Sequence, residues 1–237
     1  MAACGGIKAD TNKLATKLGK EKFISRSVSV AGFSLREARR DGTNGNPVWI
    51  VIAGDGQAYL DPYTPAPDPT PAPSDMPSIP IALSLAKSFP ADTVIHLTRP
   101  CQFLENGANG YCDRRFWTID RYGSPVRNAY TAYAGQFTNA PIIFVGWSGG
   151  GTIAVHLAVQ RHNERHPVGL LTLASPIDTD AWTTFHNVSP LPEADNPAPY
   201  LPLRFPHILA FGKNDKIVPA NLAKTINGTV LITPFQH

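Results

Sequence analysis

The sequence has little charge and no long apolar run. Only 16% of its 237 residues are Asp, Glu, Lys or Arg, and the net charge at neutral pH is +3. No stripe of basic residues interleaved with aromatic ones is present, so nucleic acid is not expected as a partner. The longest apolar runs, such as residues 48–53, have the length of a strand and fall far short of the roughly 18 residues that a membrane-spanning helix needs.

Signatures of cofactor and metal binding are also missing. Residues 54–56 read Gly-Asp-Gly, but a proline-rich stretch rather than a helix follows them, so they are not a phosphate-binding fingerprint. His162 and His166 are four residues apart, but no third ligand accompanies them and Glu164 is misplaced for a zinc-protease motif. We therefore expect neither a metal nor an organic cofactor.

Only three cysteines are present. Cys101 and Cys112 belong to one loop and are expected to form a short disulfide, which indicates an exported protein. The alternative is a pair of reduced, buried thiols in a cytosolic enzyme.

The third cysteine, Cys4, follows Ala-Ala and resembles the end of a bacterial lipobox, although the hydrophobic leader of such a motif is not in the sequence. We expect a periplasmic or membrane-anchored lipoprotein in which Cys4 carries the lipid. A chance Ala-Ala-Cys at the terminus is the alternative.

The length fits a single domain preceded by a short terminal segment. We expect residues 1–22 to form an N-terminal segment, with a lipid-anchored amphipathic helix over 7–18, and residues 23–237 to form one α/β domain. The proline-rich stretch 61–80 is expected to be an extended loop. The irregular stretch 175–205 is expected to form a cap over the site.

Apolar patterning predicts strands that alternate with helices. The expected strands are 23–30, 33–38, 48–53, 93–97, 141–145, 168–174, 206–211 and 229–233, and the expected helices are 81–89, 124–136, 150–163 and 219–226. The first two strands are expected to be an antiparallel pair. The alternation that follows indicates a parallel sheet covered by helices on both faces.

Residues 146–150 read Gly-Trp-Ser-Gly-Gly and lie between an apolar strand and an apolar helix. This pattern puts Ser148 on a sharp strand-to-helix turn, where small residues two before and two after it allow the hydroxyl to project at the carboxyl edge of the sheet. An idle serine in a glycine-rich turn is the alternative. The flanking strand and helix favour a nucleophile, and the helix N-terminus adds a positive field.

From residue 48 onward the sequence resembles the α/β-hydrolase superfamily, in particular bacterial exported esterase-like members with Gly-Asp-Gly after the first buried parallel strand. The resemblance implies the α/β-hydrolase fold, a mostly parallel sheet with a short irregular cap, and catalytic residues in the order Ser, Asp, His. Residues 209–219 are similar to the family pattern strand-Gly-x-x-Asp-x-x-Val-Pro, which makes Asp215 the acid of the triad. Asp178 is the alternative acid, and capping of the following helix is the alternative role for Asp215.

The same resemblance implies that His237 is the general base, because it follows the last expected strand. His237 ends the sequence, whereas such chains usually continue through a closing helix; a truncated sequence and a missing helix both remain open. The oxyanion hole is expected to use the backbone N–H groups of Gly149 and of Asp55, with Gly56 as the alternative to Asp55.

These features predict a serine hydrolase that cleaves a carboxylic ester of a small molecule through an acyl-serine intermediate. A thioesterase or a peptidase would use the same triad. A protein of another class, a catalytically weak surface lipoprotein that serves as a binding module, also fits the fold, because fold alone does not imply function.

Overall fold

The computed structural model describes residues 23–42, 47–56, 58–60, 64–65, 81–89, 93–103 and 112–235. Four sequence predictions lie mostly or wholly outside these residues: the helix at 7–18, the lipid site at Cys4, the proline-rich loop at 61–80 and the base His237. The division of the chain at residue 22 therefore stays a prediction.

One mixed sheet of eight strands organises the described chain. The strands are β1 (Ile24–Val30), β2 (Phe33–Arg40), β3 (Val48–Ile52), β4 (Thr93–Leu97), β5 (Ile142–Trp147), β6 (Val168–Leu173), β7 (His207–Gly212) and β8 (Val230–Thr233). Their order across the sheet is β1-β2-β4-β3-β5-β6-β7-β8. β2 pairs antiparallel with β1 and with β4, and every pair from β4 to β8 is parallel. The predicted antiparallel start and parallel remainder are both confirmed.

Four α-helices are described between the strands: α2 (Ile81–Ser88), α3 (Ser124–Ala134), α4 (Gly149–Asn163) and α5 (Thr179–His186). The helix predicted over 219–226 was wrong in type, because this segment is the 3-10 helix η5 (Ala220–Thr225). The segment spans only six residues between Pro219 and the extended residue Ile226, and 3-10 helices are used for such short pieces. β5 runs on to Trp147, beyond its predicted end at residue 145, and so leads directly into Ser148.

The hairpin between β1 and β2 is closed by two residues with positive φ, Ala31 at 47° and Gly32 at 83°. Two such residues make a turn whose twist matches that of the flanking strands. The hairpin register pairs Val30 with Phe33 and Ile24 with Arg39.

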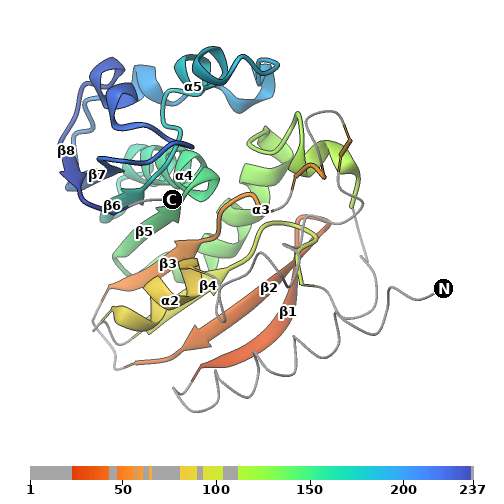
Figure 1. The fold of residues 1–237 in the computed structure, drawn as a ribbon. Coiled ribbons are helices and arrows are strands. Elements are labelled where there is room, and N and C mark those ends of the chain that lie inside the picture. Colours follow the sequence, from red (N-terminus) through yellow and green to blue (C-terminus); the bar gives the residue numbers. More distant parts are fainter. Residues whose placement is uncertain are drawn as a thin grey trace.

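The central strands send alternate side chains to opposite faces of the sheet. Val51 of β3 packs in a cluster with residues of α2, whereas Ile50 and Ile52 pack in another cluster with residues of α3 and α4. The helices therefore cover both faces, with α2 on one side and α3 and α4 on the other (Figure 1). The predicted three-layer arrangement is confirmed.

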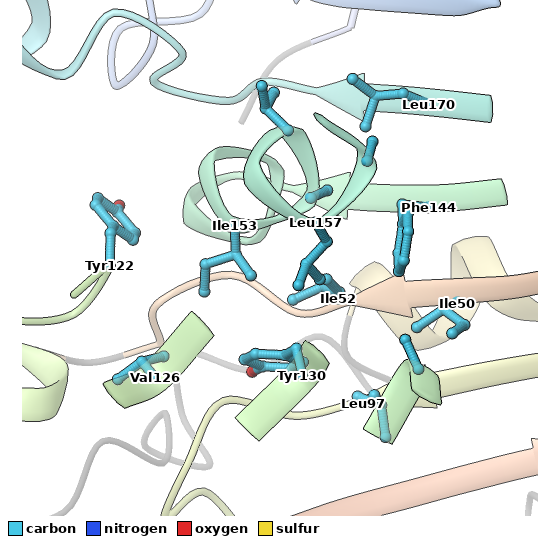
Figure 2. Close-up of a cluster of buried hydrophobic side chains, with 14 of the residues drawn as sticks. Ile50, Ile52, Leu97, Tyr122, Val126, Tyr130, Phe144, Ile153, Leu157 and Leu170 are labelled. Carbon is cyan, nitrogen blue, oxygen red and sulfur yellow. The ribbon is translucent and has the colours of Figure 1, made fainter. Parts of the chain in front are cut away.

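The larger of these clusters joins the sheet to α3 and α4 (Figure 2). Phe144 of β5, Ile153 of α4 and Val126 of α3 are all at most 1% exposed. Tyr122, which precedes α3, is equally buried and belongs to the same cluster. Because Tyr122 belongs to this core, its position is fixed relative to the sheet and to α3 and α4.

The stretch 175–205, predicted to be a cap, contains α5 and the short 3-10 helices η3 (Pro192–Ala194) and η4 (Ala198–Tyr200). α5 begins at Asp178, whose side chain accepts a hydrogen bond from the Ala181 N–H, and ends at Asn187 in the left-handed conformation. Within the described residues, no helix has the length and apolar character required to cross a bilayer.

Two buried histidines make stability depend on pH. Burial lowers the pKa of His96, on β4, and of His156, on α4, to about 4, from the ordinary value of 6.5. Below about pH 6.5 the unfolded chain binds protons that the folded chain does not, so the free energy of unfolding falls as the pH falls toward 4. The slope should be roughly 1.4 kcal/mol per pH unit for each histidine near the middle of this window.

Urea unfolding at several pH values between 7 and 4 would measure this slope. His96→Leu should have a shallower slope than the wild type, and Ile95→Val, a change in the neighbouring buried residue that removes no titrating group, should keep the wild-type slope. Equal slopes for wild type and His96→Leu would contradict the assignment.

Candidate active site

Ser148 occupies the turn between β5 and α4 in a strained backbone conformation. Its φ of 52° and ψ of −131° lie in a region that non-glycine residues rarely adopt, at a cost on the order of 1–3 kcal/mol. The Ser148 N–H donates to the Leu173 carbonyl at 2.9 Å, and the Ser148 carbonyl accepts from the Gly151 N–H at 2.9 Å. These bonds hold the strained turn at the carboxyl ends of β5 and β6.

The glycines two before and two after the serine are required by close backbone contact. A Cβ on Gly146 would lie 2.1 Å from the Gly151 Cα, and a Cβ on Gly150 would lie 2.3 Å from the Ile52 carbonyl oxygen at the end of β3. Neither neighbour is a side-chain end that could move aside. The sequence prediction that the turn needs small residues at these two positions is confirmed.

The loop after β3, residues 54–56, packs against the serine turn. A Cβ on Gly54 would lie 3.1 Å from the Ser148 Cβ, and a Cβ on Gly149 would lie 2.2 Å from Oδ1 of Asp55. The Asp55 carboxylate thus lies against the backbone of Gly149, the residue that follows Ser148. The Gln102 amide holds the loop from the other side by donating to the Asp55 carbonyl at 3.1 Å.

The Asp55 carboxylate is surrounded by one phenol and two guanidinium groups. Its Oδ2 accepts from the Tyr122 hydroxyl at 2.6 Å. Arg99 and Arg121 each approach the carboxylate to 3.6 Å. Burial, reinforced by the Asp55 charge, raises the pKa of Tyr122 well above its usual value, so this phenol stays protonated and remains a donor.

These groups open onto a pocket of about 510 Å³. The described residues that line it come from the loop after β3, the segment before α3, the serine turn, α5 and the turn after β7: Gly54, Asp55, Gly56, Ala58, Tyr59, Arg121, Tyr122, Trp147, Ser148, Pro176, Trp182, Ile217 and Val218. α5 is tied to the opposite wall, because the Trp182 Nε1–H donates to the Ile217 carbonyl at 2.7 Å. The cap predicted at 175–205 thus contributes Pro176 and Trp182 to the pocket.

Asp215 lies in the turn after β7 and is only 4% exposed. Its Oδ1 accepts from the N–H groups of Ile217 at 2.8 Å and Val218 at 2.9 Å, and both of these residues line the pocket. Oδ2 takes no part in these two bonds. The carboxylate is therefore held in a fixed orientation beside the pocket by local turn contacts. The alternative capping role predicts the same contacts, so the assignment of Asp215 as the acid stays a prediction.

Asp178, the alternative acid, accepts hydrogen bonds from two nearby groups. Its Oδ1 accepts from the Ala181 N–H and from the Asn196 side-chain amide, both at 3.0 Å. It caps α5 and holds the following loop, and, like Asp215, it is not among the described residues that line the pocket.

The described histidines lie outside the pocket lining. None of the six, which are His96, His156, His162, His166, His186 and His207, is among the described residues that line the pocket. His186 contacts a residue of the pocket wall: one of its ring nitrogens lies 2.7 Å from the Ile217 carbonyl oxygen. His237, the predicted base, lies outside the described residues.

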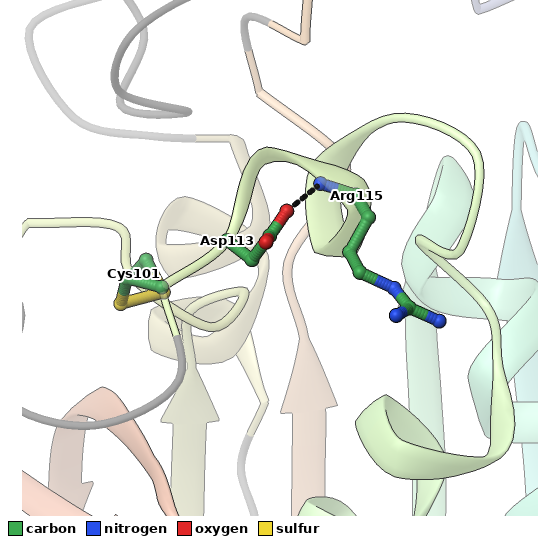
Figure 3. The surroundings of a disulfide bond; sticks show 4 residues. Cys101, Asp113 and Arg115 are labelled. Carbon is green, nitrogen blue, oxygen red and sulfur yellow. Dashed lines mark hydrogen bonds between the residues drawn. A yellow bond between two sulfur atoms is a disulfide. The ribbon is translucent and has the colours of Figure 1, made fainter.

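The predicted disulfide between Cys101 and Cys112 is present (Figure 3). It packs with Trp117 and Ala58, and Ala58 lines the pocket. Asp113, next to the disulfide, caps the 3-10 helix η1 (Arg114–Trp117) through a hydrogen bond from the Arg115 N–H at 2.9 Å. The cross-link thus anchors the segment that leads to Arg121 and Tyr122.

Sequence reasoning missed Arg99, Arg121 and Tyr122. They follow β4 or precede α3, in irregular segments with no motif and no periodicity. The composition of these segments gives no signal for their meeting at Asp55.

Comparison with known proteins identifies the fold and leaves the family open. No family model matches the sequence, and no curated protein matches it. Among solved structures, the chain is similar to a bacterial membrane phospholipase A described as a virulence factor, with a TM-score of 0.59 at 14% identity over 97% of this chain and 84% of that one.

It is also similar to mouse alpha/beta hydrolase domain-containing protein 10, with a TM-score of 0.56 at 13% identity over 90% of each chain. An esterase from Pyrobaculum calidifontis matches with a TM-score of 0.54 at 14% identity over 100% of this chain and 87% of that one. With the strand order above, these similarities establish the α/β-hydrolase fold. The expectation about fold is confirmed.

The close contacts at the serine turn predict a large difference between two glycine substitutions. Gly146→Ala forces a Cβ to within 2.1 Å of backbone and should lower the free energy of unfolding by more than about 3 kcal/mol or prevent folding. Gly135→Ala is the matched control, because nothing lies within 4 Å of the added Cβ and its backbone is helical, with φ of −58°. We expect that control to be neutral or stabilising by up to about 1 kcal/mol. Urea unfolding of both variants measures the difference, and a Gly146→Ala protein as stable as the control would contradict the geometry.

Proposed function

We propose that the protein is a serine hydrolase that cleaves a carboxylic ester. The observation that carries the proposal is Ser148, held at φ 52° on a strand-to-helix turn and lining a pocket of about 510 Å³ together with the Asp55 loop. Backbone strain of this kind persists where the surrounding structure enforces it, and it is concentrated at functional sites. The names of the similar structures, which include an esterase and a phospholipase, support the same class of reaction.

In the proposed mechanism the Ser148 hydroxyl attacks the ester carbonyl while His237 takes its proton. The tetrahedral intermediate collapses, the C–O bond to the alcohol breaks, and His237 returns the proton to the leaving alcohol. Water then attacks the acyl-serine by the same route and releases the carboxylic acid. Asp215 orients the imidazole and balances the positive charge that it gains.

The developing negative charge on the carbonyl oxygen needs two N–H donors. Gly149 follows the nucleophile and begins α4, so its N–H also has the positive end of the helix dipole behind it. The loop after β3 packs against the same turn, and we propose that the Asp55 N–H is the second donor.

The path of the chain supports His237 as the base. The Phe235 carbonyl oxygen would lie 2.3 Å from a Cβ on Gly212, at the end of β7, and the Phe235 ring is 6.4 Å from the ring of Trp147, the residue before the nucleophile. The chain therefore returns to the serine turn two positions before His237. Two residues of extended chain span up to about 7 Å, and we propose that the imidazole reaches the pocket over this length.

We also propose that the protein is exported and that Cys4 carries a lipid. The disulfide supports an oxidising compartment, because such bonds are rare in cytosolic proteins. Mass spectrometry of the protein from membranes of cells that express the natural gene would detect the acylated cysteine.

The triad can be tested by labelling and by kinetics. A fluorophosphonate probe should modify Ser148 in the wild type and should not modify Ser148→Ala. With p-nitrophenyl acetate, Asp215→Asn should lower kcat by about 10³- to 10⁴-fold, because the imidazole would be held in the wrong tautomer, and His237→Ala should lower it at least as far.

Asp178→Asn is the matched control for the acid. It neutralises the helix cap of α5 and should cost at most about 2 kcal/mol of stability while kcat stays within a few-fold of the wild type. A folded wild-type protein that neither reacts with the probe nor hydrolyses the ester would overturn the proposed function. Similar losses in Asp178→Asn and Asp215→Asn would overturn the assignment of the acid.

A further inference from the structure

One guanidinium group in the Ser148 pocket has donors without acceptors. The Arg121 side chain lines the pocket and is 11% exposed. Within the described part of the chain its guanidinium donates no hydrogen bond: Nε is buried without an acceptor, and Nη1 is 3.6 Å from Oδ2 of Asp55, which is too long for a hydrogen bond. An arginine has five N–H donors, and leaving them unpaired in a buried site is costly.

The charges around this group do not balance. Asp55 is the only carboxylate among the described residues that line the pocket, and it faces both Arg121 and the fully buried Arg99. Nη1 of Arg99 is also buried without an acceptor. Tyr122 stays neutral, so among the described residues two positive groups face one negative group.

Aromatic rings hold the Arg121 guanidinium in place. Its central carbon lies 5.8 Å from the centre of the Tyr122 ring and 5.9 Å from the centre of the Trp182 ring. Both rings belong to pocket residues. A guanidinium fixed in this way presents a planar fork that matches a carboxylate or a phosphate.

We propose that Arg121 forms an anion-binding subsite beside Ser148, so that the substrate ester carries a carboxylate or phosphate group close to the bond that is cleaved. This inference rests on the proposed function. Monoesters of dicarboxylic acids fit it, as do esters whose alcohol carries a carboxylate or a phosphate. The bound anion would supply the missing acceptors and would neutralise the excess positive charge.

Paired substrates test the subsite. Para-acetoxybenzoate and its methyl ester differ in the charge on the alcohol side, and monoethyl and diethyl glutarate differ in the charge on the acyl side. Each neutral member also carries a second ester group, so release of the phenol is followed in the first pair and the wild type is compared with the variant as a ratio. The wild type should prefer the charged member of at least one pair. In Arg121→Met the ratio of kcat/KM for the charged ester to kcat/KM for the neutral ester should fall by about 10- to 100-fold.

Arg204→Met is the matched control. Arg204 is exposed and lies three residues before the start of β7, at the amino end of that strand, and it is not among the described residues that line the pocket, so this variant removes the same charge without touching the site. It should keep the wild-type ratio. Inhibition by succinate or by inorganic phosphate, each compared between wild type and Arg121→Met, then shows which of the two anions the subsite prefers.

Binding to Ser148→Ala separates the subsite from catalysis. Calorimetry with monoethyl glutarate, para-acetoxybenzoate and inorganic phosphate should detect binding to Ser148→Ala of at least one of them, and adding Arg121→Met should weaken that binding by about tenfold or more. If no ester is cleaved but this binding depends on Arg121, the proposed function falls and the subsite stands.

Three results would overturn the subsite while the hydrolase stands. One is hydrolysis at Ser148 with no preference for charged esters. Another is an equal loss for charged and neutral esters in Arg121→Met, which would mean that Arg121 stabilises the oxyanion or the loop. The third is binding of these anions to Ser148→Ala that does not change when Arg121 is replaced.

Discussion

The site depends on the close approach of the start of α4 to the end of β3. Gly150 leaves no space for a Cβ beneath the Ile52 carbonyl, and Gly149 leaves none beside the Asp55 carboxylate. Because these contacts are between backbone and backbone or between backbone and a short side chain, they fix the helix relative to the sheet within a narrow range. The same contacts bring the nucleophile, the helix N-terminus and the loop after β3 to one point, although they come from segments far apart in the sequence.

That closeness creates an electrostatic difficulty, because a carboxylate lies next to the place where a negative oxygen would form. The chain offsets it with the Tyr122 hydroxyl and with the guanidinium groups of Arg99 and Arg121. In a pocket partly closed to water these charges act more strongly than they would at an open surface. The local charge is therefore set in part by residues outside the proposed triad.

Most of the architecture could be predicted from the sequence, because the buried parallel strands are short apolar runs and the serine turn has a motif with structural meaning. The pairing of Cys101 with Cys112 could be predicted equally well, since both belong to one loop.

The type of helix was predicted wrongly at one place. Residues 219–226 have an apolar helical pattern, yet the structure forms only a short 3-10 helix there. The resemblance to the hydrolase pattern favoured Asp215 over Asp178 as the acid, and this assignment stays a prediction. Each carboxylate accepts from backbone N–H groups two or three residues further on, Asp178 at the start of α5 and Asp215 from two residues of the pocket wall. The positions of Arg121 and Tyr122 beside Asp55 could not be predicted either, because they depend on how the irregular segment before α3 folds.

The disulfide between Cys101 and Cys112 influences the geometry of the loop after β3. It joins positions 11 residues apart, and one of its cysteines is the immediate neighbour of Gln102, whose amide grips the Asp55 carbonyl. Oxidation of these two thiols therefore narrows the conformations open to the amide as well as those of the unfolded chain. The position of the Asp55 peptide group therefore depends on whether these two cysteines are oxidised, although that peptide group does not itself react.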